Sequence, residues 1–351
     1  MNVSILGDGL SSVTLANMLV NQGVKVDIFS DKKTKKYNKI QTLGISKTNL
    51  EFFNNNILNI NKFLWNIDNI EIYSENLKSE KILNFDNKDD HLFSIIRNRN
   101  LYHHLLLNLK KNKLVTFKKK IKYSDLLKDN YDLIFNCDYS NQVSKKFFFR
   151  KIDKNYKSFA HITTFKHKKI SNNNIASQVF TKNGPLAFLP ISPTETSIVY
   201  SVKGKKDVDL NYLIKKYNTK YNILKFSELG SFELLSSNLR SYYYKNILAF
   251  GDLLHQIHPL SGQGFNMSIR DIKIFLNLIK DKNSLGLPID NSIYEEFENK
   301  TKYINFLFAS GNDFIYEFFN YDNYFSKIFF KQIFTHLNNI KLFNKIVIKS
   351  A

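Results

Sequence analysis

The residues best suited to chemistry lie between positions 246 and 271, in the segment NILAFGDLLHQIHPLSGQGFNMSIRD. A short apolar run ends at Gly251 and Asp252, and a glycine-containing loop then leads into residues with the apolar spacing of a helix. Such a loop points backbone N–H groups and the positive end of a helix dipole at its ligand, so it suits an anion. Asp252 can accept hydrogen bonds from ligand hydroxyls. An ordinary tight turn uses the same glycines, and that interpretation stays open.

A second glycine loop lies at the start of the chain. Residues 2–6 and 24–29 read as buried strands, and a glycine loop and an apolar helix lie between them. This βαβ order is the context that a dinucleotide fingerprint requires. Gly7 permits the tight turn, and Gly9 lets a pyrophosphate approach the backbone. A βαβ unit that binds no nucleotide is the alternative.

Two positions of this segment differ from the usual fingerprint. Ser12 stands where the third glycine is expected, and it is small enough for close packing of helix on strand. The acidic residue expected after the second strand falls on Ser30, with Asp31 one position later. Asp31 is therefore the candidate partner for the ribose hydroxyls.

A third segment, residues 131–146, reads as a buried strand that ends in Asp138, followed by Tyr139 and Asn141. From about residue 147 the pattern changes to alternating strands, which predicts an antiparallel sheet inserted between the two halves of a nucleotide-binding fold. After residue 279 the chain is helical and rich in aromatic residues.

These segments together resemble the FAD-dependent aromatic hydroxylases, a monooxygenase family. The strings HPLSGQGFN (258–266) and GPLAFLPISPTETSIVYSV (184–202) are most similar to the branch that hydroxylates polyprenylated phenols in ubiquinone biosynthesis. LGIS (43–46) is a partial match to a stretch that lies near the flavin in that branch. Tyr139 stands where the family has a glycine, so we expect a different turn there.

The resemblance implies an α/β fold with a Rossmann-like FAD-binding domain, an inserted antiparallel β-sheet substrate domain and a C-terminal helical region. The expected division assigns residues 1–146 and 246–285 to the FAD-binding domain, 147–245 to the substrate domain and 286–351 to a helical cap.

The resemblance also implies which residues form the site. The family has an Arg or Asn that reaches the flavin just before a helix, and the candidates here are Arg97, Asn98 and Arg99. Of these we select Arg97 as the residue expected to contact the cofactor. Pro259 and His258 are the candidates for a catalytic role, and no metal ligands are expected. The expected cofactor-binding residues are Gly7, Gly9, Ser12, Asp31, Arg97, Asp138, Gly251, Asp252, Pro259, Gly262, Gln263, Gly264 and Asn266.

The implied reaction is hydroxylation of the aromatic ring of a polyprenylated phenol. NAD(P)H would reduce FAD, O₂ would add at flavin C4a, and the resulting hydroperoxide would transfer one oxygen to the ring. Two other functions stay open. One is a different flavoenzyme, a reductase or halogenase, on the same scaffold. The other is a catalytically weakened flavin- or lipid-binding homologue that serves as a structural subunit of a biosynthetic assembly.

The composition limits the partners and the location. The 351 residues carry 51 Lys and Arg against 31 Asp and Glu, which gives a net charge of +20. Two interpretations of this charge stay open: a compositional bias towards lysine, or a surface that is attracted to anionic lipid headgroups. No signature of a nucleic-acid module accompanies the charge.

The single cysteine, Cys137, excludes an internal disulfide and any multi-cysteine metal site, and we expect a buried structural thiol. No apolar run is long enough for a membrane span and no signal peptide is evident, so we expect a cytoplasmic protein, at most peripheral to the inner face of the membrane.

Overall fold

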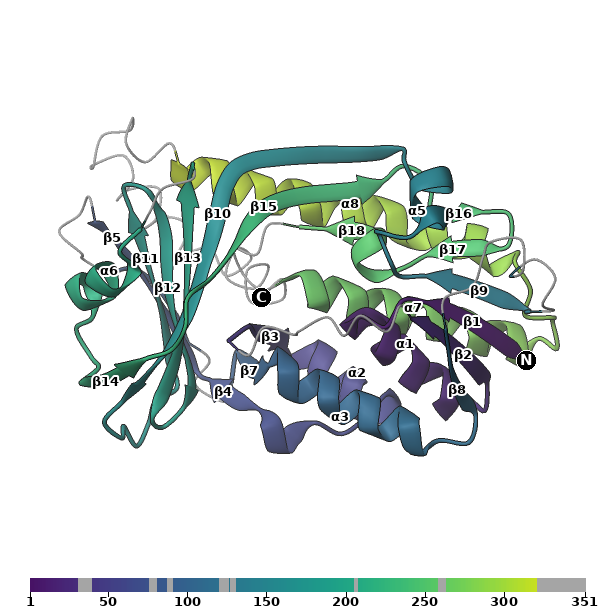
Figure 1. Cartoon of the computed structure of the whole chain (residues 1–351), viewed down its shortest axis with the longest axis horizontal. Coiled ribbons are helices and arrows are strands. Elements are labelled where there is room, and N and C mark those ends of the chain that lie inside the picture. Colours follow the sequence, from purple (N-terminus) through teal and green to yellow (C-terminus); the bar gives the residue numbers. More distant parts are fainter. Residues whose placement is uncertain are drawn as a thin grey trace.

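The computed structural model describes residues 1–30, 40–75, 81–86, 91–119, 126, 131–204, 208–257 and 263–320. The strands of these residues form a six-stranded, a nine-stranded and a three-stranded sheet. The two large sheets lie at opposite ends of the molecule, and the small sheet lies between them (Figure 1). The predicted α/β class, with parallel and antiparallel sheets, is confirmed.

The six-stranded sheet is the nucleotide-fold part of the chain. Its strands are β1 (Asn2–Leu6), β2 (Lys25–Ser30), β8 (Val115–Lys119), β9 (Leu133–Asn136), β16 (Tyr243–Tyr244) and β17 (Ile247–Ala249). They lie in the order β16-β17-β9-β1-β2-β8, and all neighbours are parallel except β16 and β17. The central strands β1, β9 and β17 are almost wholly buried, as expected of short apolar runs in a parallel sheet covered on both faces.

Helices surround this sheet and close its core. They are α1 (Leu10–Asn21), α2 (Lys47–Asn56), α3 (Asn98–Lys111), α5 (Gln142–Phe147), α7 (Gln263–Ser284) and α8 (Ile293–Asn320). The ring of Phe135 packs edge-on against Phe250 and Phe275, which joins β9, the end of β17 and α7 in one apolar cluster. The Asn17 amide bonds the Leu105 carbonyl at 3.2 Å and fixes α1 against α3.

The nine-stranded sheet forms the other end of the molecule. It contains β5 (Asn69–Ser74), β6 (Lys81–Asp86), β10 (Lys151–His167), β11 (Ile175–Thr181), β12 (Gly184–Ser192), β13 (Glu195–Lys203), β14 (Ile223–Phe226), β15 (Gly230–Leu239) and β18 (His255–Gln256). Its order is β18-β15-β10-β13-β12-β11-β5-β6, and β14 pairs with β10. Only the β11–β5 pair is parallel among these described strands.

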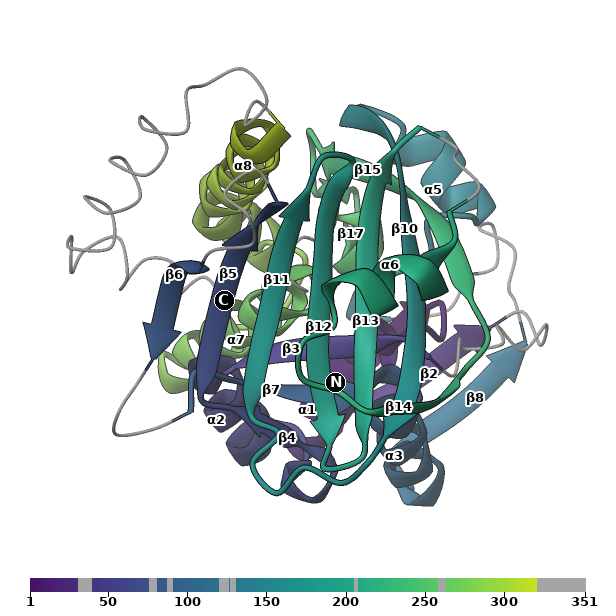
Figure 2. The ribbon, with the colours of Figure 1, turned by 90° about the vertical axis from the view of Figure 1, so that its left-hand side faces the viewer.

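The two faces of this sheet have different neighbours because strand residues alternate. On the outer face, helix α6 (Leu210–Tyr217) packs Leu210 and Ile214 against Ile198 and Tyr200 (Figure 2). Val199, between those two strand residues, points to the inner face, toward the nucleotide-fold part.

The small sheet consists of β3 (Thr42–Ser46), β4 (Trp65–Ile67) and β7 (Phe93–Arg97). Strand β5 belongs to the nine-stranded sheet, where β6 covers its free side. Leu83 and Phe85 alternate along β6 and are buried with the apolar side chains of β5, so this short run has a core face of its own.

The expected division into domains stays a prediction. Strands β5 and β6 lie in the range 1–146 that was expected for the FAD-binding domain, and they pair within the nine-stranded sheet. Residues 321–351 lie outside the described part, so their expected helical character stays a prediction. Within the described residues, no helix is both long and apolar enough to cross a membrane.

The buried hydroxyl of Tyr294 gives a test of the core. The Ile134 amide donates to this hydroxyl at 2.8 Å, and the hydroxyl donates to the Asn246 carbonyl at 3.2 Å. Tyr294→Phe leaves these groups without the partner, so we expect the free energy of unfolding to fall by about 1–3 kcal/mol in urea titrations. Tyr303→Phe, at an exposed tyrosine of the same helix, is the matched control and should change it by less than about 0.5 kcal/mol.

Candidate active site

Three turns far apart in the sequence meet at the carboxyl edge of the parallel sheet. The Cys137 amide donates to the Leu6 carbonyl at 2.9 Å, which places the ends of β9 and β1 side by side. Gly7 has φ +106°, and a Cβ atom built there would lie 3.1 Å from the Asp138 Cβ. The first and third predicted motifs therefore touch.

The second motif closes the same site from the other side. Gly251 has φ +61°, and a Cβ atom there would lie 2.5 Å from the Ser11 Cβ, closer than side chains tolerate. The Ser11 hydroxyl donates to the Ser268 hydroxyl at 3.3 Å, which joins the first turn of α1 to α7. The structure thus brings Gly7, Asp138 and Gly251 together, as their assignment to one site requires.

The backbone is open at two of the predicted glycines. Gly9 precedes α1 with extended backbone, no side chain caps the helix, and no acidic residue lies in its first turn. A Cβ atom at Gly9 or at Gly264 would meet nothing within 4 Å, so the backbone can be approached at both. The N–H groups of a helix start can hold a pyrophosphate, and the residues present fit such a group. Ser12 is fully buried and packs inside, as expected of its position.

The turn at Asp138 forms without glycine. The Asp138 carboxylate accepts hydrogen bonds from the Ser140 amide at 2.8 Å and the Ser140 hydroxyl at 2.6 Å. The Asn141 side chain accepts from the Ser144 amide at 2.8 Å and caps α5. Tyr139 is exposed, and the described non-glycine residues with positive φ are Lys157 and Lys245, so this tyrosine causes no backbone strain.

Asn266 joins the start of α7 to the small sheet. Its side-chain nitrogen donates to the Gly44 carbonyl at 2.9 Å, and its side-chain oxygen accepts from the Ser46 amide at 3.1 Å and from Asn49 at 3.0 Å. The amide of Asn266 is thus engaged with β3 and α2. The contact of this residue with a cofactor stays a prediction.

An apolar cavity lies on the other side of β3. It has a volume of about 180 Å³, and Thr42 and Ser197, whose hydroxyl oxygens are 3.1 Å apart, form part of its wall. Its described lining contains no charged side chain and consists of Ile40, Gln41, Thr42, Gly44, Ile70, Phe93, Ile95, Ile162, Ala176, Ser177, Gln178, Pro185, Ala187, Leu189, Ser197, Val199, Ser201 and Phe232. The cavity lies between the inner face of the nine-stranded sheet and the small sheet, so both parts of the molecule form it.

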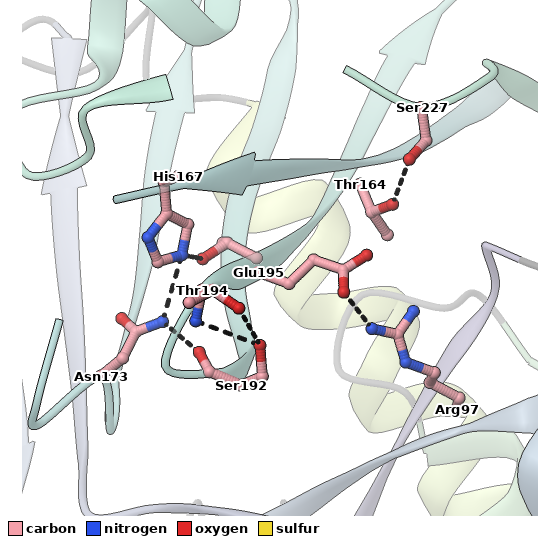
Figure 3. A network of polar contacts seen from close by, with 9 residues as sticks. Arg97, Thr164, His167, Asn173, Ser192, Thr194, Glu195 and Ser227 are labelled. Atoms are coloured by element: carbon pink, nitrogen blue, oxygen red, sulfur yellow. Dashed lines mark hydrogen bonds and ion pairs between the residues drawn. The ribbon is translucent and has the colours of Figure 1, made fainter. Parts of the chain in front are cut away.

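Arg97 points toward the nine-stranded sheet. Its guanidinium lies 2.5 Å from the Glu195 carboxylate, across the junction between β7 and β13 (Figure 3). Both side chains are partly exposed. The structure therefore assigns Arg97 an ion pair between the two parts of the molecule, and its contact with a cofactor stays a prediction.

The remaining predicted residues divide into two groups. Asp252 is exposed in a 3₁₀ turn (Gly251–Leu253), and Gln263 begins α7. The other group, Asp31, His258, Pro259 and Gly262, lies outside the described residues, so these assignments stay predictions.

Cys137 lies among these turns as a protonated thiol. Burial, with smaller contributions from the carboxylates of Asp252 and Asp138, raises the pKa of Cys137 to about 12. The thiolate is the reactive form of cysteine, so this residue is not a nucleophile near neutral pH. The residue is half-buried rather than fully buried as predicted, and its raised pKa agrees with an unreactive thiol.

Several residues that shape the site were missed in the sequence. Ser11 and Asn49 occupy ordinary polar positions in helical patterns, and nothing in the chain marks their partners. Glu195 follows a turn-rich stretch, but the Arg97 that it pairs with lies 98 residues away. Such contacts depend on the tertiary fold.

Comparisons with known proteins find partial similarity to ubiquinone hydroxylases. No protein-family model matches the chain. It is 26% identical over 153 residues to the 3-demethoxyubiquinol 3-hydroxylase of Escherichia coli, a match that covers 41% of the chain and 39% of that protein. It is 25% identical over 178 residues to the ubiquinone hydroxylase UbiL of Rhodospirillum rubrum, covering 48% and 41%. The chain thus matches about two fifths of the length of these curated relatives.

A solved structure shows the same fold. The structure of pqsL, described as a probable FAD-dependent monooxygenase from Pseudomonas aeruginosa, superposes with a TM-score of 0.74 at 14% identity and covers 96% of this chain and 98% of that one. The fold predicted by resemblance is confirmed, and so is the resemblance to the ubiquinone-biosynthesis hydroxylases.

Substitutions at two glycines distinguish an effect on stability from an effect on cofactor binding. Gly251→Ala places a methyl group against Ser11 at positive φ, so we expect it to destabilise the protein by about 2 kcal/mol or more. In Gly264→Ala the added methyl group lies in open space at a helical position, so the melting temperature should stay unchanged. The methyl group would stand where FAD is expected to approach the backbone, so we expect the FAD affinity to fall about tenfold. Thermal unfolding and quenching of flavin fluorescence measure the two effects. Unchanged FAD affinity in Gly264→Ala would contradict this placement of the cofactor.

The Cys137 thiol gives a test of pH dependence. Because its pKa is raised in the folded protein, it stays protonated while the unfolded chain's thiol ionises near pH 9. We therefore expect the stability of the wild type, relative to Cys137→Ala, to be constant below pH 9 and to fall as the pH rises from 9 to 11. Iodoacetamide at pH 8.5 should label the native protein at least about tenfold more slowly than the protein in urea. Equal labelling rates would show that the thiol is accessible and ionised.

Proposed function

We propose that this protein is an FAD-dependent monooxygenase that hydroxylates the aromatic ring of a polyprenylated phenol in ubiquinone biosynthesis, with NAD(P)H and O₂ as co-substrates. One observation carries the proposal. The start of α7 is bonded to the wall of the uncharged cavity, because Asn266 donates to the Gly44 carbonyl and Gly44 lines the cavity. A ring in the cavity would lie beside the group held by the turns.

FAD, when bound, would supply the activation of O₂, chemistry that protein side chains lack. Gly7, Gly9 and Gly251 would hold it through close approach of the backbone, and Asp252 would accept hydrogen bonds from its hydroxyls. The 22-residue helix α7 begins at Gln263, within the segment that is expected to contact FAD. The positive end of its dipole would therefore stabilise negative charge on the bound cofactor.

The cavity contributes exclusion of water and selection of the ring. Ile95, Ala187 and Val199 present apolar surface, and the Gln41 and Gln178 amides can hydrogen-bond a ring oxygen. An apolar cavity of about 150 Å³ binds benzene in a well-studied lysozyme variant. A volume of about 180 Å³ therefore suits one substituted ring, and a polyprenyl chain must extend out of it.

The polyprenyl chain also bears on location. Such a substrate partitions into lipid, and a net charge of +20 favours an anionic surface. We therefore propose contact with the inner face of the membrane, from the cytoplasmic side and without a span.

The first experiment is an absorbance spectrum of the purified protein, followed by anaerobic addition of NADPH. We expect flavin bands near ~450 nm that bleach with NADPH, and a hydroxylated product when a polyprenylphenol and O₂ are added. Bound flavin that NADPH fails to bleach, with or without the phenol, would favour the non-catalytic subunit. A colourless protein that takes up no FAD would refute the proposal.

Filling the cavity tests the placement of the ring. Val199→Trp adds an indole to the cavity wall, so we expect FAD binding to be kept while product formation falls at least about tenfold. Leu224→Trp, at an exposed position of β14 outside the cavity lining, is the matched control and should leave product formation unchanged. Product assays by mass spectrometry measure the difference. Equal activity in the two variants would place the substrate elsewhere.

A further inference from the structure

Aromatic and basic residues gather on the surface around the end of α5. In the segment KKFFFRK (145–151), Phe149 is exposed, and the guanidinium of Arg150 lies 5.8 Å from its ring centre. The ring of Phe147 stacks on the ring of Tyr244, with 4.3 Å between the ring centres. This stacking places the end of α5 beside the hairpin of β16 and β17.

A groove between β10, β15 and α8 continues this surface. The Arg240 amide donates to the Arg150 carbonyl at 3.0 Å, so the two arginines are neighbours on adjacent chain segments. Ile152 and Arg240 line one side of the groove, and Tyr303 and Phe306 of α8 line the other. Helix α5, the start of β10 and α8 lie along the upper side of the molecule in both Figure 1 and Figure 2. We call this surface the basic–aromatic face.

The apolar side chains of the basic–aromatic face are exposed to water. Tyr303, Phe306 and Leu307 have the i, i+3, i+4 spacing of one helix face, and 69%, 49% and 49% of their surfaces are exposed. The other exposed apolar members are Phe149, Ile152 and Tyr244. Exposed apolar residues that lie singly are common, but a group of them marks an interaction site.

The basic side chains of this face are exposed and unpaired. Within the described residues, five of its cations form no ion pair, namely Lys145, Lys146, Arg150, Arg240 and Lys245. In the described lining of the groove, the one carboxylate is that of Glu298, and it is paired with Lys302 at 2.6 Å. Asp153 follows Ile152 and therefore points to the other face of β10, where it accepts a hydrogen bond from Ser237. The excess positive charge suits an anionic partner.

The residue types distinguish three classes of partner. Lysine is depleted at interfaces between proteins, which argues against a second copy of this chain. Nucleic-acid bases stack on exposed ring faces, but Phe147 and Tyr244 cover each other, and Ile152 and Leu307 offer no ring. At a bilayer surface, by contrast, aromatic and aliphatic side chains enter the acyl boundary while lysine and arginine contact the headgroups.

We propose that the basic–aromatic face docks the protein on a membrane surface that contains anionic phospholipids. The inference deepens the proposed membrane contact by naming the surface that makes it, and it rests on the proposed function because a polyprenylated substrate resides in lipid. Strand β15 connects this face with the cavity, since Phe232 near its start lines the cavity and Arg240, just after its end, lines the groove.

The test measures binding of the full-length protein to phosphatidylcholine vesicles with and without phosphatidylglycerol. Lys145→Glu/Lys146→Glu is compared with Lys110→Glu/Lys111→Glu, because each pair is exposed and lies in the last turn of a helix. The two variants have the same net charge. They differ in the place of the change, since α3 lies on the opposite side of the molecule from α5 (Figure 1).

A second pair of variants tests the apolar part of the face. Tyr303→Ala is compared with Tyr212→Ala, because both tyrosines lie on helices and are 69% and 63% exposed. Tyr212 belongs to α6, on the outer face of the nine-stranded sheet (Figure 2). Melting temperatures of all four variants check that the fold is kept.

We expect the wild type to bind the vesicles that contain phosphatidylglycerol but not those of phosphatidylcholine alone, with an affinity that falls as the salt concentration rises. Lys145→Glu/Lys146→Glu should weaken this binding at least about tenfold, and Tyr303→Ala at least about threefold. The two control variants should each change the affinity by less than about twofold.

Two results would refute docking through this face, namely a wild type that does not bind the anionic vesicles, and an equal loss of affinity in the two lysine variants. If the protein sediments as a dimer that Tyr303→Ala dissociates, the face joins two copies of the chain and the membrane proposal is wrong.

Vesicle binding needs neither FAD nor turnover, so its outcome is independent of the proposed function. A protein that binds vesicles in the expected pattern but takes up no FAD would refute the proposed function and support the docking face. A protein that hydroxylates a polyprenylphenol in detergent but binds no vesicles would refute the docking face alone.

Discussion

The site depends on a steric constraint, which is the close approach of three turns at one edge of the parallel sheet. Gly7 lies against Asp138, and Gly251 lies against Ser11, at distances where a Cβ atom would collide or press on its neighbour. Both glycines also have positive φ, which other residues adopt at a cost of about 1–3 kcal/mol. The turns can therefore converge only because these positions lack side chains. The open backbone at Gly9 and Gly264 has a different cause, since nothing in the described protein fills the space beside them.

Strand β3 connects this edge to the substrate sheet. One side of the connection is the Asn266 amide, bonded to Gly44 and Ser46, and the other is the hydroxyl contact of Thr42 with Ser197. A displacement of α7 would therefore move the cavity wall, and a change in the wall would move the start of α7. The cavity wall and the start of α7 are therefore connected through β3.

Much of this fold could be predicted from the sequence because its signals are local. Apolar runs, glycine loops and strand alternation give the βαβ unit, the antiparallel insertion and the order of the motifs. The strand nature of residues 42–46 was missed, since β3 is stabilised by pairing with β7, whose partner residues lie about 50 positions later. The Arg97–Glu195 pair and the contact of Ser11 with Ser268 could not be predicted either, because their partners also lie far apart in the sequence. At Tyr139, where the family has a glycine, the turn closes through the bond of Asp138 with the Ser140 amide and needs no positive φ.

The contacts that join the two parts of the molecule differ in what they can contribute. The Arg97–Glu195 pair is short but partly exposed, and exposed pairs contribute about 0–1 kcal/mol because water screens them. The bonds of Asn266 are largely buried, and a buried amide left without its partners costs about 1–3 kcal/mol for each group. The neutral contacts at β3 therefore determine the relative position of the cavity and the start of α7 more strongly than the ion pair does. Arg97 is consequently free to exchange Glu195 for another anion without loss of the architecture, and its predicted contact with a cofactor is compatible with the pairing that the structure shows.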